Sequence, residues 1–337
     1  MEYKIKELVL KHTWTIARNS TNYKENILVK AEKDGITGYG EAAPNIRYHE
    51  TVESTIEVIE RAISLFERWN PWNFVELGYA IKELATGQTA AKAALDISLM
   101  DWITKSLRLP MFQYFGFNRE KTPITTFSIG IDSIEMIKRK VKEAAPYPVL
   151  KVKLGLENDE EIIEAIRSVT EKPLRVDANE GWKDKHLALE KINWLSKKGV
   201  EFVEQPMPST LLEDSIWLRE RSAIPLIADE SVKTAFDIPT LVNAFDGINI
   251  KLMKAGGLQE SLRMIWLAKT LGMKVMLGCM VESSVAISAA ASLSPIVDYA
   301  DLDGNLLIIN DPFDGVQVVQ GKLILNELPG IGVVDKL

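Results

Sequence analysis

The sequence predicts an α/β fold, a (β/α)8 TIM-like barrel with an N-terminal α+β capping domain. From about residue 122, eight short apolar runs alternate with helix-length amphipathic segments, as in parallel strands joined by helices. The even spacing of these runs favours a closed barrel over a doubly wound open sheet. The residues before that point follow another pattern. We therefore expect a capping domain over residues 1–120, the barrel over 121–310, and a C-terminal segment, 311–337, that returns to the capping domain.

The first domain is predicted from strand-like runs followed by helical patterns. Apolar alternation around a Lys33-Asp34-Gly35 turn indicates three strands, at residues 4–10, 26–31 and 37–41. The polar stretch from Arg18 to Lys24, between the first two strands, is expected to form a mobile loop. Helical spacing predicts helices at residues 51–69, 73–84 and 88–106.

The barrel elements follow from the alternation of apolar runs and amphipathic segments. The eight predicted strands lie at residues 125–129, 149–153, 174–177, 202–204, 226–229, 247–251, 274–279 and 299–303. The clearest helical patterns between them lie at residues 159–168, 185–197 and 258–271. Two further strand-like runs, at residues 316–319 and 322–325, are expected to pack against the first domain.

Composition narrows the classes of function. The chain has 337 residues, of which 46% are hydrophobic and 26% charged, which is typical of a globular protein with a sizeable core. A formal charge of -7 argues against a nucleic-acid surface. Cys279 is the one cysteine, so no intrachain disulfide can form, and a reducing compartment is expected. With no apparent signal sequence or membrane span, we expect a cytoplasmic homo-oligomer with no nucleic-acid or membrane partner.

Charged residues end five successive predicted strands. They are Lys153, Asp177, Glu204, Asp229 and Lys251, separated by 24, 27, 25 and 22 residues. Each step is the length of one strand–helix unit, so these residues occupy equivalent positions. In a parallel barrel such positions meet at the C-terminal mouth, where active sites form.

Three carboxylates at one barrel mouth would repel one another strongly, so they require a cation. Oxygen ligands without histidine or cysteine suit Mg²⁺, with Mn²⁺ as an alternative, rather than zinc. We predict that Asp177, Glu204 and Asp229 bind one such ion in each subunit. The positions left open on the ion would accept a substrate carboxylate.

Two lysines flank the predicted metal ligands along the chain. Closure of the barrel would place Lys153 and Lys251 on opposite sides of a bound substrate. A lysine near a dication has its neutral form favoured and can act as a base. Two bases that face one carbon are what a racemase or epimerase needs, with the metal stabilising the enediolate. Lys151 lies on the same strand face as Lys153 and is expected to assist electrostatically.

These runs resemble the muconate-lactonising subgroup of the enolase superfamily over nearly the whole chain. The superfamily uses lysine bases and magnesium-stabilised enediolates. Its members include cycloisomerases, o-succinylbenzoate synthases, racemases and epimerases, so the shared residues do not define the reaction. The runs that carry the resemblance are Lys151-Val-Lys153, Asp177-Ala-Asn, Glu204-Gln-Pro, Asp229-Glu-Ser and Asn-Ile-Lys251.

A second resemblance concerns the eighth strand. Asp301-Leu-Asp303 resembles the Asp-x-Asp signature of the dipeptide epimerase family, whose aspartates bind the ammonium group of a dipeptide. Carboxylates at i and i+2 share one strand face and can form charge-assisted hydrogen bonds to a cation. Ser128, Cys279 and Met280 are expected to line the same pocket.

The resemblance leaves the dipeptide's side chains open. Relatives that act on Ala-Glu carry an arginine in the first-domain loop, and Asn19 occupies the corresponding position here, with Arg18 beside it. Arg18, Lys24 and Arg47 are therefore candidate substrate-binding residues. The murein-derived peptide L-Ala-D/L-Glu and hydrophobic dipeptides are both expected substrates.

The resemblance thus implies 1,1-proton transfer, through an enediolate, at the α-carbon of the C-terminal residue of a dipeptide. The alternatives are an o-succinylbenzoate synthase, an N-acylamino acid racemase or another muconate-cycloisomerase-like enzyme. A further alternative is a metal-dependent binding protein without catalysis, which retention of Lys153 and Lys251 disfavours.

Overall fold

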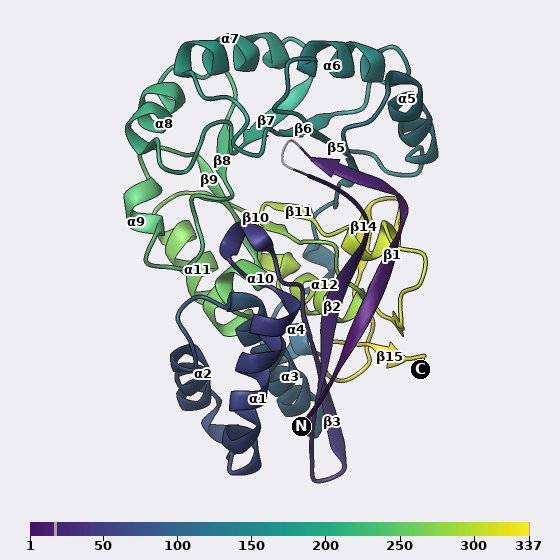
Figure 1. Cartoon of the computed structure of the whole chain (residues 1–337), viewed down its shortest axis with the longest axis vertical. Helices are drawn as coiled ribbons and strands as arrows, with labels where there is room; N and C mark the ends of the chain where they lie inside the picture. Colours follow the sequence, from purple (N-terminus) through teal and green to yellow (C-terminus); the bar gives the residue numbers. More distant parts are fainter. Residues whose placement is uncertain (17–18, 337) are drawn as a thin grey trace.

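The computed structural model describes residues 1–16 and 19–336 (Figure 1). Its N-terminal sheet is antiparallel, in the order β1 (Glu2–Ile16), β2 (Asn19–Lys33) and β3 (Ile36–Ala42). Asp34 and Gly35 have positive φ angles of 53° and 72° and form the turn between β2 and β3, as predicted.

The expected loop between the first two strands was wrong for the residues that the structure describes. Residues 19–24 belong to β2, and Thr21 pairs with Trp14 across a long two-stranded hairpin. Polar side chains stabilise this pairing, since Thr13 Oγ1 donates to Asn22 Oδ1 over 2.7 Å. The polar composition of residues 19–24 suggested a loop. In the structure these residues are extended because they pair with the residues of β1. Arg18 lies outside the described residues.

Three helices follow this sheet, close to their predicted positions: α1 (Val52–Glu67), α2 (Phe74–Glu83) and α3 (Thr89–Ser106). Helices α1 and α3 pack against the sheet, and α2 packs against α3. The alanines of α3 let it approach β3 closely. A Cβ added at Gly40 would lie 1.9 Å from the Ala94 carbonyl oxygen, so only glycine permits this contact. The connecting elements are η1 (Ile46–Tyr48), η2 (Pro71–Asn73), α4 (Met111–Tyr114) and η3 (Arg119–Lys121).

The predicted barrel is confirmed. Eight parallel strands follow one another in chain order, each paired with the next. They are β4 (Phe127–Ile129), β5 (Leu150–Lys153), β6 (Leu174–Asp177), β7 (Val200–Glu204), β8 (Leu226–Ala228), β9 (Gly247–Lys251), β10 (Lys274–Gly278) and β11 (Tyr299–Asp301). A parallel bridge between Thr125 and Ala300 joins the last strand to the first and closes the ring.

Helices connect the barrel strands on the outside (Figure 1). They are α5 (Ile134–Glu143), α6 (Asp159–Arg167), α7 (Lys185–Ser196), α8 (Leu212–Arg219), α9 (Ile238–Leu241), α10 (Leu252–Ala255), α11 (Leu258–Thr270) and α12 (Ser284–Ala291), with η4 (Ser294–Ile296) before β11. The eighth strand is followed by a short helix, η5 (Gly304–Leu306). Within residues 1–16 and 19–336, every helix is too short or too polar to cross a lipid bilayer.

The C-terminal segment contacts the first domain through its last residues, whereas its strands near residues 321–323 lie beside Thr122, Ile124 and Pro148 at the start of the barrel. It forms two short pairs, β12 (Phe313–Asp314) with β15 (Val334–Asp335) and β13 (Gln317–Val319) with β14 (Lys322–Ile324). Asp335 bonds to Lys30 Nζ of β2 at 3.0 Å and to the Tyr39 hydroxyl of β3 at 3.2 Å. The domain boundaries at residues 120 and 310 stay predictions.

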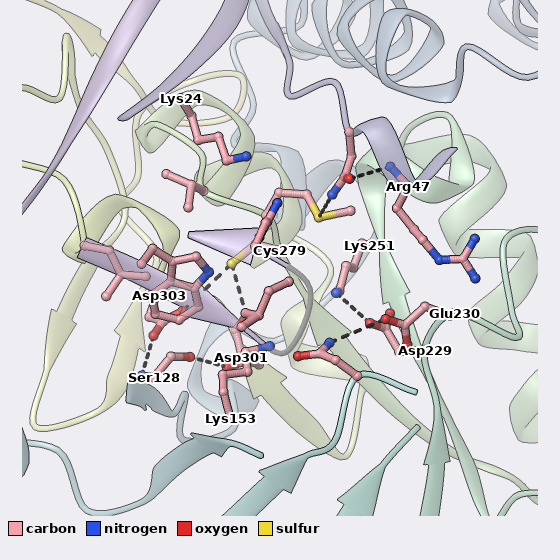
Figure 2. Close-up of a pocket in the computed structure, with 18 of the residues that line it drawn as sticks. Lys24, Arg47, Ser128, Lys153, Asp229, Glu230, Lys251, Cys279, Asp301 and Asp303 are labelled. Carbon is pink, nitrogen blue, oxygen red and sulfur yellow. Dashed lines mark hydrogen bonds and ion pairs between the residues drawn. The ribbon is translucent and has the colours of Figure 1, made fainter. Parts of the chain in front are cut away.

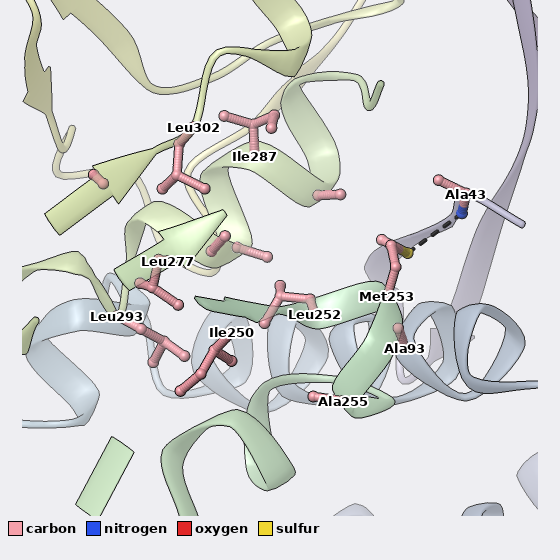
Figure 3. Close-up of a cluster of buried hydrophobic side chains, with 14 of the residues drawn as sticks. Ala43, Ala93, Ile250, Leu252, Met253, Ala255, Leu277, Ile287, Leu293 and Leu302 are labelled. Atoms are coloured by element: carbon pink, nitrogen blue, oxygen red, sulfur yellow. Dashed lines mark hydrogen bonds between the residues drawn. The ribbon is translucent and has the colours of Figure 1, made fainter. Parts of the chain in front are cut away.

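One hydrophobic core joins the capping domain to the barrel. Figure 3 shows its centre, where α10 lies along α3 beside the barrel strands. Met253 of α10 accepts a hydrogen bond at its Sδ from the Ala43 amide, and Leu277 and Ile250 are fully buried below it. This shared core holds the first domain against the barrel and so supports the position of β1 and β2 over the barrel mouth.

Candidate active site

A cavity of about 380 Å³ opens where the carboxyl ends of the barrel strands meet (Figure 2). Lys153, Lys251 and Asp301 line it from the strand ends, and Trp14 and Lys24 line it from the β1–β2 hairpin. Its size falls within the usual range for small-molecule pockets, roughly 300 to 1,000 Å³. The predicted pocket residues Ser128, Cys279, Met280 and Asp303 also line it.

The three predicted metal ligands converge on one another next to this cavity, and Asp229 lines it. Asp177, Glu204 and Asp229 are fully or almost fully buried, and each offers a carboxylate oxygen within 4.8 Å of the other two. Strand register explains the cluster, because Asp177 is paired directly with Glu204 in adjacent strands. A buried set of oxygen donors alone fits a hard divalent cation such as Mg²⁺.

The electrostatics of the three carboxylates differ. Burial raises the pKa of Glu204 to about 7, and the neighbouring charge of Asp177 adds to this effect. Burial acts in the same direction on Asp177 and Asp229, but their lysine partners outweigh it and hold both pKa values below the usual range. The cluster therefore carries unrelieved repulsion at Glu204, which a bound cation would reduce.

Lys153 and Lys251 reach the cavity from opposite sides of the barrel. They end β5 and β9, which are four strands apart in a ring of eight. Lys153 Nζ lies 2.6 Å from Asp177, and Lys251 Nζ lies 2.9 Å from Asp229. Burial lowers the pKa of Lys251, but the carboxylates of Asp229 and Glu204 outweigh it and raise that pKa above its usual value.

Lys151 occupies a different position from the other two lysines. Its ammonium contacts three carboxylates, with Nζ 2.6 Å from Asp301, 2.7 Å from Glu204 and 3.2 Å from Asp177. It is 1% exposed, and these carboxylates raise its pKa against the opposing effect of burial. Lys151 thus lies below the cavity as a shared counter-ion for its acidic residues.

Asp301 and Asp303 both line the cavity, but their carboxylates have different partners. Asp301 pairs with Lys151 and accepts a hydrogen bond from the Thr126 hydroxyl. Asp303 accepts a hydrogen bond from the Ser128 amide at 2.6 Å, and no basic side chain in the described part of the chain forms an ion pair with it. Burial and the charge of Asp301 raise the pKa of Asp303 to about 7.

Lys24 is the residue of the hairpin that gives the cavity an uncompensated positive charge. Burial lowers its pKa, and among residues 1–16 and 19–336 no carboxylate pairs with it. Arg47 also lines the cavity, but its guanidinium binds Glu180 at 2.9–3.1 Å. Burial and nearby acids raise the pKa of Cys279 well above its usual value, which disfavours a thiolate.

Two polar residues that support the site were not predicted from the sequence. Lys254 Nζ binds Asp229 at Oδ1 over 2.6 Å and also binds three backbone carbonyls. Asn249 Nδ2 donates to Glu204 Oε1 over 2.7 Å. Asn249 could have been found, because it lies two residues before Lys251 on the same strand face. Lys254 follows Lys251 at helical spacing, and only the fold shows where it points.

Fold and site together define a class of (β/α)-barrel enzymes in which a carboxylate metal site lies between two lysines. Residues 3–116 match the family model of the mandelate racemase / muconate lactonizing enzyme N-terminal domain, and residues 133–335 match the model described as enolase C-terminal domain-like. The chain belongs to the dipeptide epimerase family of the enolase superfamily.

Individual relatives match along almost the whole chain. The L-Ala-D/L-Glu epimerase of Bacteroides thetaiotaomicron is 49% identical over 97% of this chain and 86% of its own. The substrate-liganded L-Ala-D/L-Glu epimerase of Bacillus subtilis has a TM-score of 0.94 at 26% identity, covering 99% and 98% of the two chains. The Enterococcus faecalis dipeptide epimerase, solved with Mg and L-Leu-L-Tyr, has a TM-score of 0.93 at 32% identity and 98% coverage of both chains.

Proposed function

We propose that this chain is a Mg²⁺-dependent dipeptide epimerase that inverts the α-carbon of the dipeptide's C-terminal residue. The observation that carries the proposal is the arrangement of three converging carboxylates between Lys153 and Lys251, which face one cavity from opposite sides. Relatives at 49% and 32% identity that are named as dipeptide epimerases support it.

The metal site would be formed by Asp177, Glu204 and Asp229. A bound Mg²⁺ would supply positive charge beside the substrate carboxylate, where negative charge accumulates when the α-proton leaves. Asn249 and Lys254 hold Glu204 and Asp229 in place through short hydrogen bonds, so this part of the site is rigid before substrate arrives.

Proton transfer is assigned to Lys153 and Lys251. One lysine, as the neutral amine, accepts the α-proton from its side of the substrate. The other, as the ammonium, returns a proton to the opposite face of the same carbon, which gives the epimer. Each lysine donates to one carboxylate among the described residues, so each retains donor or acceptor capacity toward the cavity.

Asp303 is the residue best placed to bind the dipeptide ammonium. Its carboxylate lines the cavity and is not neutralised by a basic side chain within the described residues. Binding of an ammonium would favour its ionised form and form a charge-assisted hydrogen bond. Asp301 would act mainly by holding Lys151 and by adding negative charge to this end of the cavity.

Lys24 favours an acidic side chain on the residue that is inverted. A half-buried ammonium that has no carboxylate partner within the described residues is stabilised by a carboxylate ligand. We therefore propose L-Ala-L-Glu and L-Ala-D-Glu as the preferred pair. Lys24→Met should lower kcat/KM for these dipeptides by about 10- to 100-fold, the loss of one charge-assisted contact, with a smaller effect on L-Ala-L-Leu.

The test is deuterium incorporation at the α-carbon in D₂O, followed by NMR with metal-replete enzyme. Wild-type enzyme should exchange and invert both epimers. Lys153→Ala and Lys251→Ala should each abolish inversion, yet each should retain exchange with only one epimer, and the two variants should retain opposite ones. Lys274→Ala, which removes a surface lysine paired with Asp298, is the matched control. Absence of exchange from every dipeptide tried would exclude the proposal.

The alternative substrates, N-acylamino acids and the precursor of o-succinylbenzoate, carry no free ammonium. Asp303→Asn should therefore reduce turnover of dipeptides strongly and leave turnover of N-acylamino acids nearly unchanged. The opposite ranking would favour the alternative reactions over dipeptide epimerisation.

A further inference from the structure

A second cavity, of about 270 Å³, lies between the capping domain and the barrel. Helices α2 and α3 form one wall. The opposite wall is formed by α10, by α11 and by the segment that precedes α9. Gly87 and Gly256 lie in its wall and have positive φ angles of 65° and 87°, so the chain turns there without side chains. It shares no lining residue with the candidate active site.

Basic side chains dominate this cavity. Lys82, Lys92, Lys233 and Arg263 line it, whereas Asp96 and Glu260 are its acidic residues. Arg263 and Glu260 neutralise each other at 2.9 Å. In the described part of the chain, none of the three lysines forms an ion pair. The cavity therefore has an excess of positive charge.

The acidic residue Asp96 forms no ion pair with these lysines within the described residues, and both of its oxygens accept hydrogen bonds from amide groups. Oδ2 accepts from the Leu258 amide at 2.5 Å and the Gln259 amide at 3.2 Å, at the start of α11. Oδ1 accepts from Gln259 Nε2 at 2.7 Å. Asp96 thus caps the start of α11.

Lys92 is the most informative residue of this cavity. It exposes 8% of its surface, and among the described residues its ammonium has one acceptor, the Ala85 carbonyl at 2.5 Å. An ammonium carries three donors, so two are not used by the described residues. Burial lowers the pKa of Lys92, and the like charge of Lys82 lowers it further. A buried cation without a carboxylate partner is costly for a protein to maintain.

We propose that this cavity binds a small divalent oxyanion, of the size of inorganic phosphate or a short dicarboxylate, through Lys92, Lys82 and Lys233. The anion would accept the two unused donors of Lys92 and neutralise the excess charge. The volume, about 270 Å³, admits a small metabolite and is below the size of the dipeptide cavity. This site is independent of the proposed epimerase activity, so its test does not require turnover.

The test is calorimetric titration of the Mg²⁺-replete full chain with inorganic phosphate and, separately, with succinate, at constant ionic strength. We expect saturable 1:1 binding of at least one of them, with Kd below about 10 mM. Lys92→Met should weaken it about tenfold or more, and Lys82→Gln should weaken it less. Lys24→Gln, which removes a cation of the other cavity, should leave the affinity unchanged.

Thermal unfolding supplies a second measurement. The direction in which the melting temperature changes distinguishes an anion-binding lysine from one with a purely structural role. Without added anion, Lys92→Met should raise the melting temperature, because a buried uncompensated charge is removed. With phosphate or succinate present, the wild type should gain stability and the variant should not. If Lys92→Met does not fold, the weakened binding of Lys82→Gln decides. The proposal is overturned if neither anion shows saturable binding. It is also overturned if Lys24→Gln abolishes the binding while Lys82→Gln preserves it.

Discussion

Replacing Glu282 by glutamine should stabilise the folded chain, and the gain should increase with pH. Glu282 follows β10, is 1% exposed, and accepts a hydrogen bond from the Met280 amide at 2.7 Å. Burial raises its pKa from 4.5 to about 8, and the charge of Glu41 contributes in the same direction. Glu41 receives hydrogen bonds from Asn26, Ser283 and Ala286, so its charge is better stabilised, and the proton resides on Glu282.

The size of the effect follows from linkage. A carboxyl group whose pKa is raised by folding binds its proton more tightly in the folded state, so stability falls as pH rises between the two pKa values. For Glu282 this window runs from 4.5 to about 8. Each pKa unit corresponds to about 1.4 kcal/mol, so the glutamate costs about 2 kcal/mol at pH 6 and between about 4 and 5 kcal/mol above pH 8. Glutamine has the same shape and does not ionise.

The measurement is urea unfolding of wild type and Glu282→Gln at about pH 6 and pH 9, with the gain in unfolding free energy compared at the two values. We expect the advantage of the variant to increase by about 2 to 3 kcal/mol between them. Glu190→Gln, the same substitution at an exposed residue of α7, is the surface control. An equal or smaller advantage at pH 9 would refute the assignment of a buried proton to Glu282.

Three further predictions concern the barrel and its charges. Chelation of divalent metal should abolish α-deuterium exchange, and added Mg²⁺ should restore it, as measured by NMR, whereas exchange that persists after chelation would contradict the metal site at Asp177, Glu204 and Asp229. Lys254→Met should lower the unfolding free energy by about 3 to 5 kcal/mol in urea titrations, because the Asp229 carboxylate loses a buried partner, and a loss below about 1 kcal/mol would argue against that contact. Leu277→Ala should cost about 2 to 5 kcal/mol in the same assay, since Leu277 is fully buried, and a smaller cost would mean that the core collapses around the gap.

Much of the candidate site could be predicted because, in a parallel barrel, residues one strand–helix unit apart in the sequence lie at equivalent strand ends. Steps of 22 to 27 residues between charged strand ends place Asp177, Glu204 and Asp229 at one mouth, and the structure brings their oxygens within 4.8 Å. The side chains that complete the site depend on contacts between distant segments. Lys151 and Asp301 are 150 residues apart and meet only because β5 and β11 belong to one closed ring.

The first domain was harder to predict for a related reason. The polar residues of β2 have no apolar alternation, so the pattern indicated a loop. In the structure Thr13 and Asn22 form a polar pair across the hairpin, and Trp14 and Lys24 contribute to the cavity from it. Trp14 and Lys24, which line the cavity, thus come from a segment whose structure is determined by pairing with its neighbour rather than by its own composition.

Four lysines contact the proposed metal ligands, and they differ in how many of their ammonium donors are already bound. This difference distinguishes the lysines that support the site from those that can act on a substrate. Lys151 contacts three carboxylates, and Lys254 binds four acceptors, so neither has a donor left for a ligand. Lys153 and Lys251 each donate to one carboxylate and line the cavity. Those carboxylates, Asp177 and Asp229, are also proposed metal ligands. A cation that shares them weakens the field that keeps Lys251 protonated, so metal binding and the supply of a neutral amine are coupled through the same oxygens.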